Sequence, residues 1–199
     1  MSLTVNGSSA TNIDPIPEGT HLGVCNMLID LGMQYSEAFE NTARKVLIGW
    51  EIPEETIELE DGTHPRMISK RYTASLNESA NLRHDLAAWR GRDFTPEELA
   101  AFDLRNIIGK SCLLTVIHKE SNGKTYANIQ SVTALPKGMQ KGELTDGSTI
   151  FDLDADPIDA VETLPKWIAD VIKKSSTYQE RLNAPQFTEL PDDEEGLPF

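Results

Sequence analysis

Apolar and polar residues alternate along the first third of the chain with the period of a β-strand. The stretch 21–35, HLGVCNMLIDLGMQY, is long enough for one strand with a bulge or bend at Gly32. In the stretch 43–53, ARKVLIGWEIP, Trp50 lies on the apolar face, and Pro53 is expected to end the strand. After the turn EDGT, the stretch 65–76 predicts a third strand.

The hydrophobic period then changes to that of a helix. In the stretch 77–92, apolar residues recur at helical spacing as far as Trp89, and Gly91 suits the end of the helix. A second helix is expected to begin with Thr95 as its N-cap and Pro96 at the first helical position. A helical segment therefore follows the third strand.

Two more strands are expected at 110–120 and 124–135, on either side of the turn SNG. This order predicts a mainly β fold with helical insertions. A five-stranded OB barrel has its helical segment between strands 3 and 4, as here. Other small barrels and α+β sheets share the order.

We expect four segments along the chain. They are a flexible N-terminal arm (1–17), an OB-fold nucleic-acid-binding domain (18–140), a linker with short helices (141–182) and a disordered acidic tail (183–199). The stretch LPKWIADVIKKS is amphipathic and predicts a helix that docks on the core or forms an assembly contact, so a homo-oligomer is left open.

No stretch is long and apolar enough for a membrane span, and the start lacks the pattern of a signal peptide, so we expect a cytoplasmic protein. Cys25 and Cys112 have no metal-ligand spacing and are interpreted as buried, reduced thiols. The four histidines show no metal spacing either. We therefore expect no cofactor and no membrane partner.

The net charge of −14 is unevenly distributed. Residues 1–61 contain 11 acids and 2 bases, whereas residues 62–141 contain 7 acids and 12 bases. Residues 142–199 contain 14 acids and 4 bases. Because salt screens charges beyond about 8 Å, the basic middle of an acidic protein can still attract an anion.

The basic middle also contains aromatic residues at strand spacing. Cations that follow phosphates, interleaved with aromatic rings on which bases stack, are typical of sequence-tolerant single-strand binding. Tyr72 and Tyr126 are the expected stacking platforms, although a tyrosine on a barrel strand can also belong to the core. The predicted DNA-binding residues are Lys70, Arg71, Tyr72, Arg83, Arg90, Arg92, Lys119, Lys124 and Tyr126.

The arginines and the acidic residues each allow an alternative interpretation. The three arginines of 83–92 could pair with Asp85 and Asp93 instead of phosphates, but phosphate contact is favoured. The acids between Glu51 and Glu60 are interpreted as the solvated flank of a hairpin, and DLDADPIDAVET fails as a calcium loop because Pro157 occupies the glycine position. No nucleotide-binding or hydrolase motif is present, so no catalytic or metal-binding residue is predicted.

The chain ends in a run of acids followed by a short apolar tip. The residues concerned are Asp192, Asp193, Glu194, Glu195, Leu197, Pro198 and Phe199. This ending resembles the acidic tip of bacterial single-stranded DNA-binding proteins, although Gly196 separates the acids from Leu197. The resemblance implies that the tip docks on replication or recombination proteins, with its aromatic residue in an apolar pocket.

The stretch from SKRYTASL to LLTVIH, followed by GKTYANIQSV, resembles a group of phage-encoded replication proteins. The resemblance covers residues 18–140 and implies an OB fold that binds single-stranded DNA in the host-cell cytoplasm. Two other functions remain open. An acidic interaction protein or DNA mimic would bind a protein instead of DNA, and a metal-dependent nuclease would use the acids at 51–60.

Overall fold

The alternating segments fold into one curled, mainly antiparallel sheet. The computed structural model describes residues 14–37 and 40–184. The strands are β1 (Gly19–Ser36), β2 (Asn41–Leu59), β3 (Gly62–Thr73), β4 (Ser111–Ser121), β5 (Lys124–Thr133) and β6 (Thr149–Phe151). The helical elements are α1 (Asn81–Arg90), α2 (Pro96–Ala100), η1 (Leu104–Ile107), η2 (Ile158–Thr163), α3 (Lys166–Lys173) and α4 (Ser176–Asn183). Within this part of the chain, no helix has the length and apolar character needed to cross a membrane.

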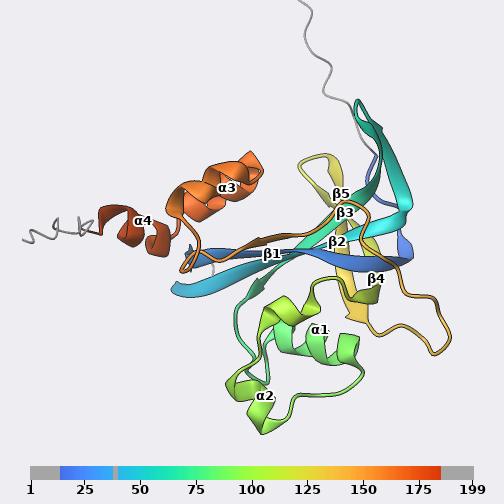
Figure 1. Ribbon diagram of the computed structural model, residues 1–199, viewed down its shortest axis with the longest axis horizontal. Coiled ribbons are helices and arrows are strands. Elements are labelled where there is room, and N and C mark those ends of the chain that lie inside the picture. Colours follow the sequence, from blue (N-terminus) through green and yellow to red (C-terminus); the bar gives the residue numbers. More distant parts are fainter. Residues whose placement is uncertain (1–13, 38–39, 185–199) are drawn as a thin grey trace, which may run out of the picture.

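The sheet curls into a half-barrel with α1 and α2 on one side (Figure 1). Five strands follow the order β3-β2-β1-β4-β5, and each is antiparallel to its neighbour. The sixth strand, β6, pairs in parallel with the middle of β1, beyond the part that pairs with β4. No ladder joins β3 to β5 in the described residues. The expected five-stranded barrel is therefore corrected in two respects: the sheet is open, and it has six strands.

Strand β1 bends at the predicted glycine. Its pairing with β2 shifts register between Asp30 and Gly32. Gly32 has a φ of 70°, and a Cβ there would lie 2.6 Å from the Ser175 Oγ and 2.7 Å from the Leu153 Cδ2. The bulge thus brings the backbone of β1 against the C-terminal segment at a distance that only glycine allows.

Strand β2 continues beyond the proline that was expected to end it. The strand reaches Leu59. Its pairing with β3 shifts register between Ile52 and Thr56. This irregularity takes Pro53, which has no N–H group, out of the ladder. The prediction that Pro53 ends the strand is wrong for this reason.

One face of the sheet packs against α1 to form the first hydrophobic core. Leu82, Leu86 and Trp89 of α1 are buried in it, as their helical spacing predicts. The Trp50 and Trp89 rings lie 5.9 Å apart between centroids, and both are buried. The two tryptophans are therefore core residues.

The ends of the two inserted helices follow the predicted signals. Gly91 closes α1 in the left-handed conformation, with a φ of 70°. Thr95 caps α2 by accepting a hydrogen bond from the Glu98 N–H, and the Glu98 carboxylate accepts one from the Thr95 N–H. This capping box fixes the position of Glu98.

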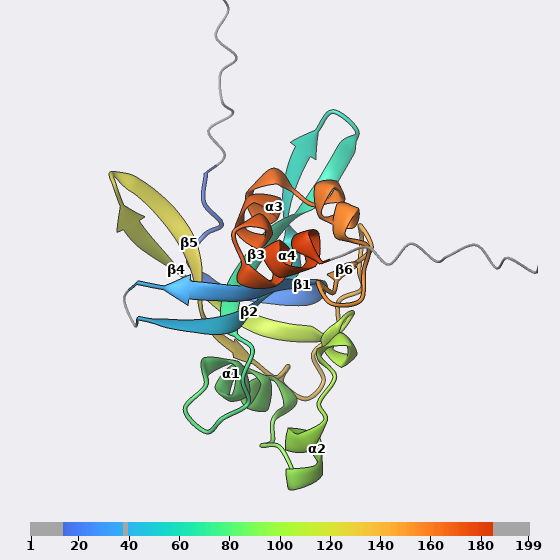
Figure 2. The same cartoon turned by 90° about the vertical axis from the view of Figure 1, so that its left-hand side faces the viewer.

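The C-terminal segment covers the opposite face of β1 and β2, as Figures 1 and 2 show. Ile29 and Leu47 of the sheet, with Ile168 and Ile172 of α3, are buried in this second hydrophobic core. The segment 141–182, expected to be a linker with short helices, therefore completes the fold, and its strand β6 was not predicted. The amphipathic helix α3 docks on the core. The homo-oligomer stays a prediction.

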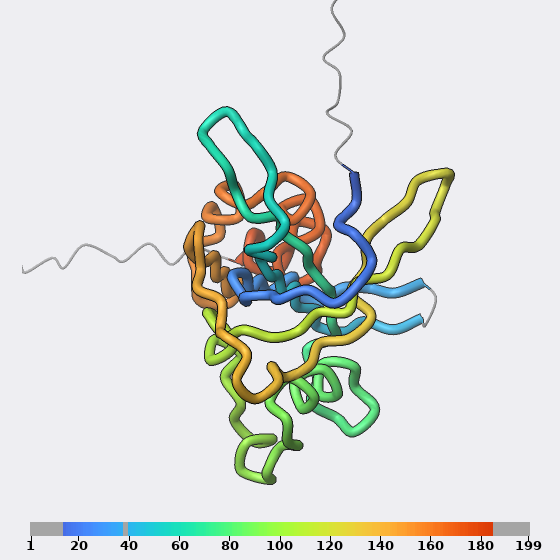
Figure 3. The backbone as a smooth tube through the Cα atoms, turned by 90° about the vertical axis from the view of Figure 1, so that its right-hand side faces the viewer, coloured from blue at the N-terminus to red at the C-terminus, as the bar shows by residue number. Residues whose placement is uncertain are grey.

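The end of the N-terminal arm is held on the sheet. Ile16 is buried in the first core, and its carbonyl oxygen lies 2.8 Å from the His118 Nε2. Arg66 donates a hydrogen bond to the Asp14 carbonyl. This segment passes between the β2–β3 and β4–β5 hairpins (Figure 3), so the expected flexible arm is anchored from residue 14 onward.

Candidate nucleic-acid interface

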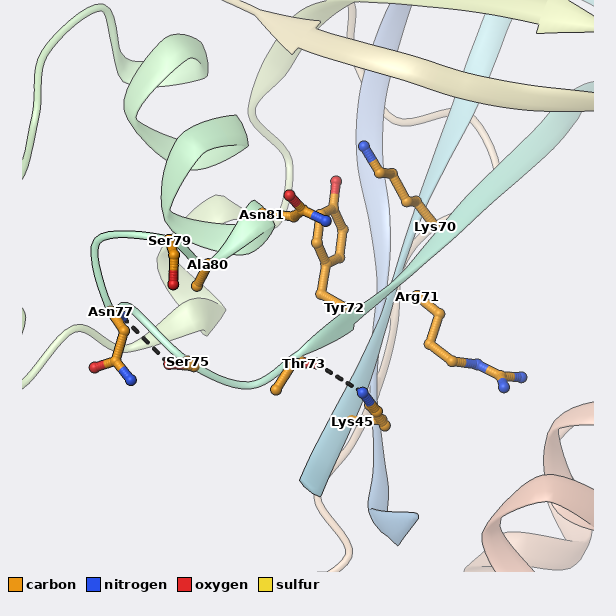
Figure 4. A pocket seen from close by; sticks show the side chains of 10 residues that line it. All are labelled: Lys45, Lys70, Arg71, Tyr72, Thr73, Ser75, Asn77, Ser79, Ala80 and Asn81. Atoms are coloured by element: carbon orange, nitrogen blue, oxygen red, sulfur yellow. Dashed lines mark hydrogen bonds between the residues drawn. The ribbon is translucent and has the colours of Figure 1, made fainter. Parts of the chain in front are cut away.

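Strand β3 directs its predicted DNA-binding side chains to two sides. Lys70 and Tyr72 project to one side and Arg71 to the other (Figure 4). The Lys70 Nζ lies 2.6 Å from the Asp85 Oδ2 on α1, and the Tyr72 hydroxyl donates to the same oxygen at 2.7 Å. Arg71 is exposed and forms no ion pair within the described ranges. The predicted alternation is confirmed, but α1 already occupies one of the two sides.

The Tyr72 ring does not provide a stacking platform. Only 3% of the residue is exposed. Burial, together with the Asp85 charge, raises the pKa of Tyr72 far above its usual range, so the phenol stays protonated and donates to Asp85. A base cannot reach a ring in this position. This correction follows from the packing of α1, which places Asp85 over the end of β3.

The β4–β5 hairpin presents a cation beside an exposed ring. Lys119 lies directly across the strand pair from Tyr126, which is 49% exposed. Lys124 begins β5 after the turn at Asn122 and Gly123, both of which have positive φ. Neither lysine has an ion-pair partner among the residues that the structure describes. This hairpin therefore combines the two features that the sequence predicted for single-strand binding.

The three predicted arginines of the helical segment are ion-paired. The Arg83 Nη2 lies 2.9 Å from the Asp93 Oδ2, the pairing that the sequence left open. Arg90 and Arg92 both pair with Glu98, and the Arg92 Nη2 lies 2.6 Å from its Oε1. A phosphate would have to displace a carboxylate at each position. Their phosphate contacts stay a prediction that the geometry does not favour.

Two hollows lie along β3. The first, of about 410 Å³, contains Lys45 and Arg71, together with hydroxyl and amide side chains from Thr73 to Asn81 (Figure 4). The second, of about 650 Å³, is lined by Arg66, Lys124 and Tyr126. We call Lys45, Arg66, Arg71, Lys119, Lys124 and Tyr126 the β3 surface.

Two cations of the β3 surface were missed as site residues. Lys45 is placed on the polar face of its predicted strand, and its Nζ donates to the Thr73 Oγ1 at 2.7 Å. Arg66 begins the alternating stretch that also contains Lys70. The polar face that holds Lys45 and the face that Arg66 shares with Lys70 were usable signals, but the sequence alone does not place Lys45 beside the end of β3.

Three carboxylates come together at the bulge of β1. Atoms of Asp30, Asp152 and Asp154 lie within 4.8 Å of one another. Arg44 pairs with both Asp30 and Asp154. These two carboxylates raise the pKa of Arg44 above its already high value, so the guanidinium stays charged. This arrangement is a structural ion cluster in which an arginine occupies the position that a cation would take.

Glu51 is not part of a solvated acidic flank. The residue is fully buried, and its Oε1 accepts a hydrogen bond from the Thr145 N–H at 2.6 Å. Gly142 of the same segment packs so closely on β1 that a Cβ would lie 2.6 Å from the Val24 Cγ2. For Glu51 the expectation fails because the segment that follows β5 folds over this part of β2, whereas the acids at positions 54, 58 and 60 are exposed, as expected. Glu51 therefore anchors that segment.

Both cysteines lie in the hydrophobic core as free thiols, as predicted. Burial raises the pKa of Cys25 to about 12 and also raises the pKa of Cys112. Because the thiolate is the reactive form, neither thiol is suited to nucleophilic chemistry or metal binding.

The predicted partner-binding tip, from Asp192 to Phe199, lies outside the described residues. No model of a known protein family matches the chain, and no curated protein sequence matches it significantly. The β3 surface is therefore interpreted from its own chemistry.

Proposed function

We propose that the protein binds single-stranded DNA without sequence preference, through an OB-like half-barrel, in phage DNA replication or recombination. The strand follows the β3 surface. The acidic C-terminal tip recruits replication or recombination proteins to the bound strand. The phage context and the role of the tip rest on the two sequence resemblances.

The cations of the β4–β5 hairpin and of β3 carry the proposal. Lys119 and Lys124 are exposed beside the accessible ring of Tyr126, and Arg71 is exposed farther along β3. Such cations neutralise phosphates, while an exposed ring stacks on any base because every base has a π-face. Hydrogen-bond readout of a base edge is not required, so the expected binding is tolerant of sequence.

The topology supports an OB-like interpretation. Three strands precede α1 and two strands follow it, while β3 and β5 form the outer edges of the curled five-strand path. OB folds are partly open five-stranded barrels that bind oligonucleotides on strands 2 and 3 and on the loop between strands 4 and 5. The β3 surface occupies the corresponding elements here. Arg71 pairs with Leu47 and so projects to the face that the C-terminal segment covers, but Arg71 itself is exposed at the edge of the sheet.

Fluorescence anisotropy of labelled oligo-dT tests the proposal in the full chain at several salt concentrations. The informative variant combines Arg71→Gln, Lys119→Gln and Lys124→Gln. If each cation neutralises one phosphate, the slope of log affinity against log salt falls by about 2, and affinity at about 0.1 M salt falls about 100-fold. The matched control is Lys137→Gln, Lys166→Gln and Lys174→Gln, which removes three exposed charges outside the β3 surface.

The control should bind as the unmodified chain does, apart from a small effect of net charge. Equal losses in the two triple variants would contradict a specific role for the β3 surface. If the unmodified chain does not bind oligo-dT at low salt, single-strand binding is excluded. The acidic-mimic function then becomes the interpretation to pursue, by a search for a protein partner.

A further inference from the structure

A third pocket, separate from the β3 surface, lies between α1 and the start of β4. Its volume is about 430 Å³. Its apolar lining comes from Leu86 and Trp89 of α1, from Phe102 and from Ile107 of η1. We call it the helix pocket. It shares no residue with the β3 surface, so strand binding leaves its role unexplained.

Three cations surround this apolar lining. Lys110 and Lys141 are exposed and have no ion-pair partner in the residues described. The Arg90 guanidinium lies over the rings of Phe94 and Phe102, at 4.4 and 5.3 Å from their centroids. Arg90 pairs with Glu98 through Nη2, whereas its buried Nη1 has no hydrogen-bond partner among the described atoms. A ligand for this pocket should combine apolar side chains with negative charge.

We propose that the helix pocket binds the C-terminal segment 185–199 of the same molecule. The segment PQFTELPDDEEGLPF contains five acids and no lysine or arginine. Leu197 and Phe199 follow the acids after Gly196, so apolar groups would enter the pocket while the carboxylates meet Lys110 and Lys141. The charges and the apolar groups of the two partners are thus complementary.

The length of the segment permits this contact. Fifteen residues span at most about 50 Å, and a globular body of this size is about 40 Å across. The helices α4 and α1 lie on neighbouring sides of the molecule in Figure 1. A tether of this length provides a roughly millimolar effective concentration, so even a millimolar dissociation constant gives about half occupancy. Bound in this way, the tip is withheld from other proteins until a competing pocket or salt releases it.

Two-dimensional NMR of the ¹⁵N-labelled full chain tests the proposal without DNA, so its outcome is independent of strand binding. The comparison is with the double variant Leu197→Ser/Phe199→Ser, which keeps every charge. We expect amide shift differences at Gly109, Lys110 and Gly142, and none across β3 at residues 69–73. Tenfold dilution should leave these differences unchanged, because the contact is intramolecular.

A charge variant of the pocket provides the second arm. Lys110→Glu/Lys141→Glu should abolish the effect of Leu197→Ser/Phe199→Ser on the pocket amides. The control Lys137→Glu/Lys166→Glu makes the same change of charge elsewhere. In this control the double serine variant should still shift the pocket amides. Shift differences at β3 would place the segment on the strand-binding surface and overturn the proposal. A complete absence of differences, or differences that disappear on dilution, would overturn it as well.

Discussion

The chain has cations in two regions, and the two differ in what surrounds the charge. On the β3 surface, Arg71, Lys119 and Lys124 are exposed without ion pairs in the described part of the chain. In the helical segment that contains α1 and α2, Arg83 and Arg92 are held by carboxylates. Surplus positive charge in a sequence window therefore does not identify which cations are free to meet a phosphate.

The two tyrosines repeat this comparison for the aromatic residues. Tyr72 and Tyr126 both lie on strands beside a lysine, yet only 3% of the former is exposed, against 49% of the latter. The difference arises because α1 covers the end of β3, whereas the β4–β5 hairpin projects from the sheet (Figure 3). A neighbouring helix thus converts a potential binding residue into a structural one.

Removal of the exposed ring should give the largest effect of a single substitution on strand binding. Tyr126→Ala is expected to weaken oligo-dT binding by about 1–3 kcal/mol, roughly 5- to 150-fold, because stacking is lost. The unfolding midpoint in urea should stay close to that of the unmodified chain. Tyr126→Phe keeps the ring and should bind almost normally. Equal losses from both variants would show that the ring does not act by stacking.

Lys70 and Tyr72 share the carboxylate of Asp85, and its removal tests whether Tyr72 has a structural role. Asp85→Ala leaves the buried Tyr72 hydroxyl without its acceptor and should lower the free energy of unfolding by about 1–3 kcal/mol. Oligo-dT affinity should not fall, because Lys70 becomes free. Asp170→Ala changes an exposed aspartate within α3 and serves as the matched control in urea denaturation. A loss of DNA affinity without a loss of stability would show that Asp85 and Tyr72 act in DNA binding and not in stabilising the fold.

The sequence predicted the periodic features of the fold better than the contacts between distant segments. Alternation in the stretch 65–76 correctly grouped Lys70 with Tyr72, but it could not show which side meets α1. That choice depends on Asp85, which reaches β3 only after the helix has packed on the sheet. Strand β6 escaped prediction because three residues carry no usable period, and its pairing with β1 is a contact between distant parts of the chain.

The site residues also divide into those set by local structure and those set by contacts with distant segments. Lys119, Lys124 and Tyr126 belong to a local hairpin, and their exposure agrees with the interpretation made from sequence. Arg83 depends on Asp93 in the loop before α2, and Arg92 depends on Glu98 within α2. Sequence spacing did not reveal Glu98 as a partner. Local geometry was predictable, whereas the choice between a phosphate and a carboxylate was not.

The paired arginines should contribute little to strand binding. Arg83→Gln/Arg92→Gln is expected to change oligo-dT affinity by less than about threefold, because each charge is already balanced by a carboxylate. Stability should change by about 1 kcal/mol or less, the usual range for exposed ion pairs. Anisotropy and urea denaturation measure the two effects. A loss near that of the β3-surface triple variant would restore these arginines to the interface.

The smallest expected effect is on the pH dependence of stability. Hydrogen bonds from Arg92, from the Thr95 N–H and from Arg90 lower the pKa of Glu98 from its ordinary value of 4.5 to about 2. In the unfolded chain the carboxyl group takes up a proton near its ordinary pKa, so its contribution is complete above about pH 4.5 and is lost as the pH falls toward about 2. Glu98→Gln should therefore differ most from the unmodified chain above pH 4.5, and the two should converge in acid. Urea denaturation across this range measures the difference, with Glu143→Gln at an exposed position as control; a difference that does not vary with pH would place the role of Glu98 in the helix cap alone.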